Sequence, residues 1–225
     1  MTKTKTEMLT IMFVDMVNYT KTTNKLDREK FHYLHDVFDT HIYNVVKDYN
    51  GKLIKKLGDA FLVSFKSSTE AVLCGRALQI KFNEHNLLTQ DEPIHIRVAI
   101  HAGEVVHRHG DIFGDVVNIT SRIESIVKSG DVVFSELVYS SMNKNEVTYK
   151  YIGEFEFKGA DHPINLFKIK TKQDFINEKK IIRRRKAKRL KKQIKSLIYR
   201  FVTIGVIGII IYLMLTNQDL LLSLF

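Results

Sequence analysis

The chain has 225 residues, of which 44% are hydrophobic, and it carries two prolines, one cysteine and a formal net charge of +10. Such a chain is long enough to bury one sizeable core with appendages. A single cysteine excludes a disulfide framework, and Cys74 lies in an apolar run where it reads as a small buried hydrophobic residue. This cysteine usage favours a reducing compartment.

The positive charge is concentrated near the C-terminus. Twelve Lys and Arg residues, and no acidic ones, lie between Lys179 and Arg200, which leaves 23 basic against 25 acidic residues elsewhere. The remaining chain is therefore slightly acidic and has no basic face that could follow a phosphate backbone. We expect no nucleic-acid partner.

The first 171 residues alternate between strand-like and helix-like patterns. In chain order, the patterns predict a strand at 8–15, a helix at 27–50, a hairpin at 52–65 around Gly58 and Asp59, a helix at 68–88, one or two strands at 94–106, a helix at 116–128, and strands at 131–135, 147–157 and 164–170. The βαββαβ order predicts an α+β fold in which helices cover one face of the sheet.

Two acidic residues stand at the ends of predicted strands. Asp15 ends the first strand and Asp59 lies at the tip of the hairpin, so the two meet at one edge if those strands are neighbours. Hard oxygen donors of this kind suit Mg²⁺ or Mn²⁺ bound together with substrate phosphates. A Gly-Asp hairpin tip is also an ordinary turn signal, so each acid alone says little.

The predicted helix at 116–128 carries an Asn and an Arg four positions apart. Helical geometry places Asn118 and Arg122 on one face, about one turn from each other. This spacing fits either a solvated polar face or a pair of side chains aimed at a ligand.

Five segments in this order give the chain a family resemblance. FVDMVNYT, KLIKKLGDAFLVSF, IRVAIHAGEVV, GDIFGDVVNITSRIES and GEFEFKGADHPINLFKI together resemble the class III nucleotidyl cyclase catalytic domain, and most closely the bacterial adenylyl cyclases. The resemblance covers about residues 8–170. It implies a ferredoxin-like core with an antiparallel sheet.

The resemblance implies a metal site and a reaction. Asp15 and Asp59 would bridge two Mg²⁺ or Mn²⁺ ions, together with the backbone carbonyl of Met16. The reaction would convert ATP to 3′,5′-cyclic AMP and pyrophosphate by attack of the ribose 3′-oxygen, with one metal activating that oxygen and the other neutralising the leaving group.

The resemblance also implies which residues bind the nucleotide. Lys55 and Asp111 would read the base, Asn118 would orient the ribose, Arg122 would meet charge developing on the α-phosphate, and Lys158 would hold the terminal phosphates. The metal acids of one chain would work with the Asn and Arg of a second, so that a homodimer forms two equivalent sites.

Base preference follows from hydrogen-bonding chemistry. A lysine donates to adenine N1 and an aspartate accepts from the 6-amino group, whereas guanine presents the opposite pattern, so Lys55 and Asp111 favour ATP. Taken alone, Lys55 could be a solvated strand lysine and Asp111 a turn residue. Alternatives are a guanylyl cyclase, a pyrimidine cyclase making cyclic UMP or cyclic CMP in signalling or phage defence, and a catalytically silent interaction module.

One position departs from the family pattern. Asn18 stands where the family usually has Gly, shortly after the first metal acid. The loop over the triphosphate therefore differs in its side chain, although Asn accepts a positive φ better than most residues.

The sequence of the C-terminal part predicts a membrane anchor. Residues 197–216 contain one charge, Arg200, and a helix of this length spans about 30 Å, the thickness of the bilayer core. We expect a catalytic domain at 1–171, a polybasic juxtamembrane helix or linker at 172–196, a transmembrane helix at 197–216 and a short tail at 217–225. A buried core helix or a segment lying on the membrane surface are the alternatives.

The basic segment predicts the orientation of the chain. Lys and Arg next to a span favour the cytoplasmic side and bind anionic lipid headgroups, so the region between Lys179 and Arg200 would contact the membrane surface. The expected location is the cell inner membrane or plasma membrane, with a single pass and a cytoplasmic catalytic domain.

Overall fold

The computed structural model describes most of the N-terminal part of the chain and little of the rest. The described residues are 5–89, 93–108, 110–171, 174, 191, 193–194, 205–209 and 211–213. The chain divides into two compact units, Met1–Thr171 and Lys172–Phe225. The first unit contains the sheet and the site, and it is described below by itself.

The predicted membrane span at 197–216 lies mostly outside the described residues. Residues 205–209 and 211–213 of that segment are helical. No helix within the described parts of the chain is both long enough and apolar enough to cross a membrane.

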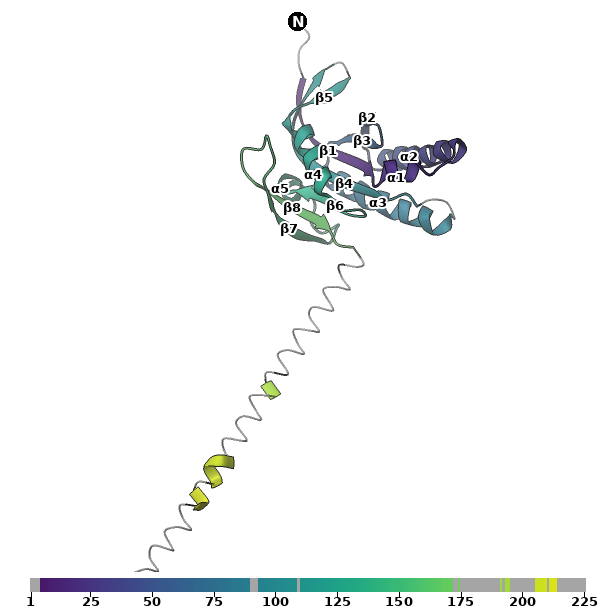
Figure 1. Ribbon diagram of the computed structural model, residues 1–225. Coiled ribbons are helices and arrows are strands. Elements are labelled where there is room, and N and C mark those ends of the chain that lie inside the picture. The colour runs from purple at the N-terminus through teal and green to yellow at the C-terminus, as the bar shows by residue number, and fades with distance from the viewer. Residues whose placement is uncertain are drawn as a thin grey trace, which may run out of the picture. The chain divides into compact units, whose positions relative to one another are not determined.

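A single twisted sheet forms the centre of the first unit (Figure 1). Its strands among the described residues are β1 (Lys5–Met16), β2 (Lys52–Leu57), β3 (Ala60–Phe65), β4 (Ile96–Arg108), β5 (Asp111–Phe113), β6 (Val132–Ser135), β7 (Tyr149–Phe155) and β8 (Ile164–Ile169). They lie in the order β2-β3-β1-β4-β6-β8-β7, with β5 paired to β4. The first four strands pair antiparallel in the order of a ferredoxin-like core, as predicted.

The rest of the sheet differs from the prediction. β6 runs parallel to β4, with Val98 opposite Val132, so the sheet is mixed and the prediction of a fully antiparallel sheet was wrong. The reason is the helix between these strands, because a crossover helix returns the chain to run in the same direction as the strand it left.

The described part of this unit contains five helices. They are α1 (Tyr19–Thr23), α2 (Arg28–Asp48), α3 (Ser68–Leu88), α4 (Asp115–Ile126) and α5 (Glu136–Ser141). The two long helices begin at side-chain caps, where Asp27 accepts a hydrogen bond from the backbone N–H of Lys30 and Ser67 accepts one from that of Glu70. α2 is followed by Asn50 in the left-handed conformation, which turns the chain into β2.

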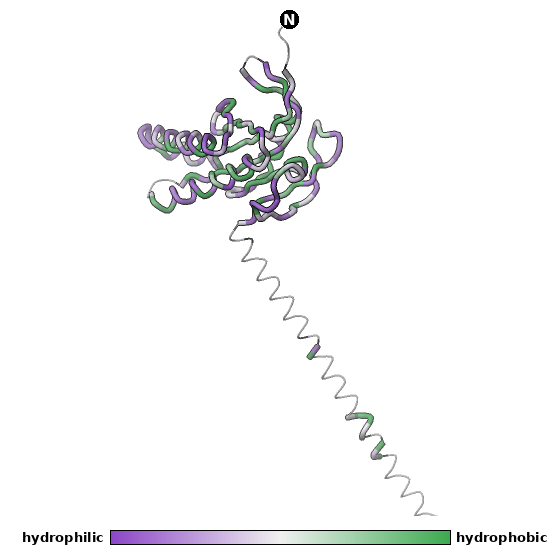
Figure 2. Tube along the Cα trace, turned by 180° about the vertical axis from the view of Figure 1, so that it is seen from behind, coloured by the Kyte–Doolittle hydropathy of each residue, from purple (hydrophilic) through white to green (hydrophobic). Residues whose placement is uncertain are grey.

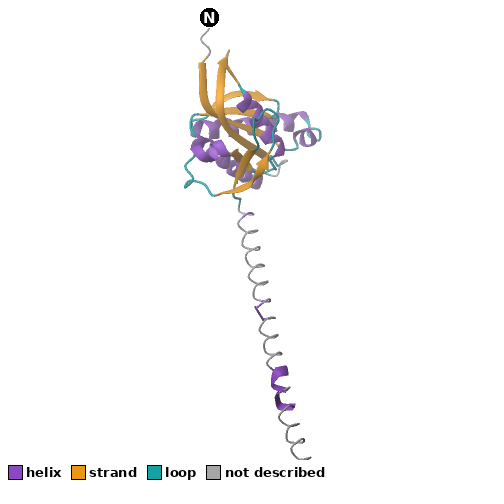
Figure 3. Ribbon diagram, turned by 90° about the vertical axis from the view of Figure 1, so that its left-hand side faces the viewer, coloured by secondary structure: helices purple, strands orange, loops and turns teal. Residues whose placement is uncertain are grey.

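Helices cover both faces of the sheet, so the prediction of one covered face was wrong (Figure 3). Along β1, Met12 and Val14 pack into the core formed with α2 and α3, whereas Ile11 and Phe13 pack on the other side, in a cluster with Val116 of α4. The apolar run of β1 is nearly continuous because both of its faces are buried.

Hydrophobic residues are concentrated along the strands and on the inner sides of the helices (Figure 2). Cys74 belongs to this core, at 0% exposure on α3, and burial raises the pKa of its thiol to about 12. The thiol therefore stays protonated and behaves as the small hydrophobic residue predicted from the sequence.

Candidate active site

Asp15 and Asp59 meet at one edge of the sheet, as predicted. Asp15 lies near the end of β1, directly opposite Ala60 at the start of β3. Asp59 occupies the β2–β3 turn, and its carbonyl accepts a hydrogen bond from the backbone N–H of Met16 at 3.2 Å. Gly58 permits this tight turn because its φ is +64°.

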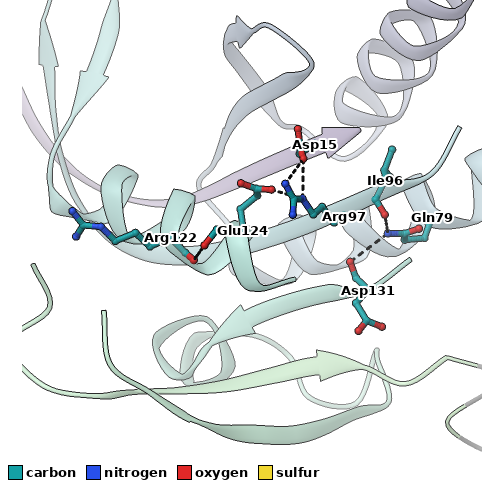
Figure 4. Close-up of polar contacts among 8 residues, drawn as sticks. Asp15, Gln79, Ile96, Arg97, Arg122, Glu124 and Asp131 are labelled. Atoms are coloured by element: carbon teal, nitrogen blue, oxygen red, sulfur yellow. Dashed lines mark hydrogen bonds and ion pairs between the residues drawn. The ribbon is translucent and has the colours of Figure 1, made fainter. Parts of the chain in front are cut away.

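An arginine and a glutamate that the sequence reasoning missed complete this edge. Arg97 of β4 lies opposite Asp15, and its Nε and Nη2 atoms approach Asp15 Oδ2 at 2.8 and 2.7 Å. Glu124 of α4 forms an ion pair with Nε of the same guanidinium. Figure 4 shows the guanidinium between the two carboxylates.

Weak signals for these two residues exist in the sequence. Arg97 is a charge between Ile96 and Val98 in an otherwise apolar strand, and Glu124 lies two residues after Arg122. Neither position indicates a partner, because Arg97 and Asp15 are 82 residues apart in the chain.

Negative charge dominates at this edge. Burial raises the pKa of Asp15, an effect that the hydrogen bond from Arg97 opposes and the nearby charge of Asp59 reinforces. Burial, followed by the charge of Asp15, raises the pKa of Glu124 to about 7. Three carboxyl groups thus share the field of one guanidinium.

The donor set fits a divalent cation held jointly with a substrate. Asp15 is buried and Asp59 is partly buried beside it, and both offer hard carboxylate oxygens. Mg²⁺ and Mn²⁺ favour such ligands. No group of three or more His, Cys, Asp or Glu side chains among the described residues is arranged so that it could hold a metal ion by itself. Phosphate oxygens of a bound nucleotide would supply the remaining ligands.

Lys55 and Asp111 are in direct contact. Nζ of Lys55 on β2 lies 2.6 Å from Oδ2 of Asp111 on β5 and 5.9 Å from the ring centre of Phe113. Both side chains are partly exposed, and the hydrogen bond from Lys55 holds the pKa of Asp111 below its usual value. The short strand β5, which pairs with β4, places the aspartate beside the lysine.

Asn118, Arg122 and Lys158 belong to a different part of the surface. Asn118 is exposed on α4, and Lys158 is exposed in the loop between β7 and β8. Arg122 lies against that loop, because a Cβ at Gly159 would stand only 2.9 Å from its Nη1. In Figure 4 its side chain extends away from Asp15, so one chain does not bring Arg122 to the carboxylate edge.

Asn18 adopts the conformation that its place in the sequence requires. Its φ is +60° and its ψ is +26°, at the residue before α1. The loop after Asp15 therefore keeps a left-handed turn although Asn replaces the usual Gly of the resembling family.

A comparison with protein families shows to which family this fold belongs. The family model of the adenylate and guanylate cyclase catalytic domain matches residues 1–172. The chain belongs to this family. The resemblance found in the sequence is thereby confirmed.

The similar proteins are longer than the present chain. The chain is 30% identical over 165 residues to the serine/threonine-protein kinase pkn2 of Myxococcus xanthus, covering 73% of this chain and 20% of that protein. It is 27% identical over 159 residues to the putative adenylate cyclase 3 of Rhizobium meliloti, covering 70% and 27%. The chain therefore spans about a fifth to a quarter of the length of these relatives.

Solved cyclase structures share the fold. The adenylyl cyclase CyaB from P. aeruginosa superposes with a TM-score of 0.64 at 21% identity, covering 76% of this chain and 98% of that one. The guanylyl cyclase Cya2 superposes with a TM-score of 0.65 at 22% identity, covering 74% and 93%. The cyclase fold thus occurs in structures of both adenylyl and guanylyl cyclases.

Proposed function

We propose that this chain is an adenylyl cyclase, which converts ATP to 3′,5′-cyclic AMP and pyrophosphate. The observation that supports ATP as the substrate is the contact between Lys55 Nζ and Asp111 Oδ2, at 2.6 Å. The contact sets a donor and an acceptor side by side on a partly exposed surface, the pair that adenine N1 and its 6-amino group need. Guanine would place its N1–H donor against the lysine donor and its 6-carbonyl oxygen against the aspartate acceptor.

The carboxylate edge would hold the metal ions. Asp15, Asp59 and the carbonyl of Met16 are the ligands that we assign to two Mg²⁺ or Mn²⁺ ions. When bound, such ions lower the pKa of the ribose 3′-hydroxyl and offset the charge of the pyrophosphate leaving group. The carboxyl groups of Asp15 and Asp59, with Glu124 beside Asp15, would attract these cations.

The groups on and near α4 would bind the rest of the nucleotide. Asn118 would hydrogen-bond the ribose, and the Arg122 guanidinium would receive charge that develops on the α-phosphate. Lys158 would bind the terminal phosphates from the β7–β8 loop. A fixed guanidinium in this role contributes about 10³-fold or more in related phosphoryl transfers.

A homodimer would bring the two sets of groups together. In one chain Arg122 points away from Asp15 (Figure 4), so a complete site needs a second chain to supply α4. Two-fold pairing gives each chain both roles and produces two equivalent sites.

Product formation from each nucleotide tests the proposal. The full chain in detergent, and residues 1–171, which form one compact unit, are incubated with Mn²⁺ and ATP, GTP, UTP or CTP. We expect cyclic AMP from ATP and little product from the others. A different cyclic nucleotide would overturn the base assignment, and no product from a folded, dimeric protein would indicate a silent module.

Two variants serve as controls for this assay. Asp15→Ala should abolish product formation while the protein stays folded, because Glu124 still pairs with the guanidinium of Arg97. Asp36→Ala removes an exposed acid on α2 and should leave the rate unchanged.

We also propose that the C-terminal segment anchors the chain in a membrane with the catalytic unit on the cytoplasmic side. The support is the apolar sequence at 197–216 and the basic run before it, which would bind anionic lipid. The full chain should resist carbonate and high-salt extraction, and residues 1–171 should remain in the supernatant. Release by high salt alone would mean that the basic run makes only an electrostatic contact.

A further inference from the structure

We infer that Glu124 is a positioning residue that draws Arg97 away from Asp15 and so frees the Asp15 carboxylate for a divalent cation. The inference rests on the proposed function, in which Asp15 is a metal ligand. It assigns to the glutamate a task that neither the metal acids nor the nucleotide-binding residues perform.

The shared guanidinium nitrogen is the basis for this inference. Arg97 Nε carries one hydrogen, and in this structure that hydrogen is directed to Asp15 Oδ2 at an N···O distance of 2.8 Å. Oε1 of Glu124 lies against the same nitrogen as an ion-pair partner. One N–H cannot serve two carboxylates at full strength, so the two acids compete for it.

Asp15 holds this hydrogen here, and Glu124 is left short of a donor. Oε1 of Glu124 is buried and has no hydrogen-bond partner among the described residues. The ion pair with Nε gives this oxygen no hydrogen of its own, so its charged form is costly, because the water it lost has not been replaced. A small rotation of the guanidinium toward Glu124 would satisfy this oxygen and release Asp15.

Glu124 therefore lowers the cost of exposing the metal ligand. A cation that binds Asp15 must displace Nε and Nη2 of Arg97, which both contact Oδ2. Without an alternative acceptor, the displaced guanidinium would lose its charged partner in a place where its side chain is 29% exposed. Glu124 provides that acceptor, already in contact (Figure 4).

The position of Glu124 links this exchange to the dimer. Glu124 lies on α4, two residues after Arg122. In the proposed dimer, this helix contributes Arg122 to the site of the second chain. A shift of α4 on dimer formation would thus move the acceptor for Arg97 as well.

Metal binding without nucleotide tests the inference through a double-mutant cycle. Mn²⁺ binding to the full chain in detergent is measured by electron paramagnetic resonance for wild type, Glu124→Gln, Arg97→Gln and the double variant. Asp15→Asn identifies the binding that belongs to this site. Thermal unfolding without metal shows that every variant is folded.

The expected result is strong coupling between the two residues. Glu124→Gln should weaken Mn²⁺ binding about tenfold, the order expected when a charged acceptor for the guanidinium is replaced by a neutral one. In the Arg97→Gln background the same change should have little effect, because no guanidinium then needs an acceptor.

Two results would overturn the inference. If Glu124→Gln weakened binding by the same factor in both backgrounds, Glu124 would act only through its charge or as a direct ligand. If it had no effect in either, it would have no part in metal binding. Cyclic AMP production by wild type distinguishes these failures from a failure of the proposed function, and Asp15→Asn binding like wild type would count against both.

Discussion

His101 is a titratable residue held in the middle of the sheet. It lies on β4 with 5% of its surface exposed, and its Nδ1 is 2.8 Å from Oγ of Ser135 on β6. Burial lowers the pKa of this imidazole to about 4, and the charge of Glu136 opposes the shift only in part. The imidazole is therefore neutral in the folded protein at physiological pH.

This buried imidazole should make the folded unit sensitive to acid. The unfolded chain binds a proton at His101 near pH 6.5, whereas the folded chain does so only near pH 4, so stability falls as the pH drops through this window. The full loss is about 3 kcal/mol from the difference between the two pKa values. Urea unfolding of residues 1–171 between pH 7 and pH 4 measures it.

The matched variant for this experiment is His101→Asn, which can still hydrogen-bond Ser135. It should reduce the dependence of the unfolding free energy on pH in this window. Parallel curves for wild type and variant would show that His101 does not carry the effect.

The Lys55–Asp111 pair should set the choice of base. Lys55→Glu combined with Asp111→Cys replaces the donor by an acceptor for guanine N1–H and removes the acceptor that faces the guanine carbonyl. Each mismatched buried polar contact is worth about 1–3 kcal/mol, so the ratio of kcat/KM for ATP to that for GTP should fall by about tenfold or more. Rates with both nucleotides give the ratio.

A neighbouring lysine provides the control. Lys56 forms its ion pair with Asp39 on α2, at 2.6 Å, instead of with Asp111. Lys56→Gln should leave the ratio unchanged, and an unchanged ratio in the double variant as well would contradict the base assignment.

At the scale of elements, α3 depends on a glycine where it crosses the sheet. A Cβ at Gly75 would stand 2.8 Å from Cγ1 of Val132 and 3.3 Å from Cγ1 of Val98. Gly75→Ala gains helix propensity of about 1 kcal/mol, but overpacking a core costs about 1–3 kcal/mol. We expect a net loss of stability, measured by urea unfolding.

A second substitution separates packing from other causes. Val132→Ala removes the closest methyl group, so in the Gly75→Ala background it should cost less than it does alone. Additive losses would show that the close approach of α3 to β6 is not the source of the destabilisation.

At the scale of the whole molecule, the separation of the two groups of site residues predicts complementation between chains. Asp59→Ala damages the carboxylate edge and Arg122→Ala damages α4, and each should be inactive alone. A mixed dimer would hold one intact site and one doubly damaged site, so random pairing should restore about a quarter of wild-type turnover. Cyclic AMP production is measured against the mixing ratio and should peak near equal amounts.

Pairing two variants of the same edge is the control. Asp15→Ala with Asp59→Ala should not regain activity, because every site in a mixed dimer then lacks a metal ligand. If the Asp59→Ala and Arg122→Ala mixture stays inactive although cross-linking shows mixed dimers, the site lies within one chain.

Local patterns in the sequence were enough for the elements that carry their own signals. The helix at 68–88 was predicted with the bounds that the structure has, and the hairpin around Gly58 and Asp59 formed where turn chemistry placed it. The short elements α1, α5 and β5 were not predicted, because a few residues do not establish a period and their conformation depends on packing.

The sequence by itself determined the βαββαβ order of the core, through local periodicity, and the family, through five ordered motifs. The metal and base-binding roles that the family implies stay predictions. Only the tertiary structure decided that α4 covers the second face, that β4 and β6 run parallel, and that Arg97 lies between Asp15 and Glu124. Such contacts join residues far apart in the chain, so no local pattern encodes them, and they form only when the packed sheet and helices bring these residues together.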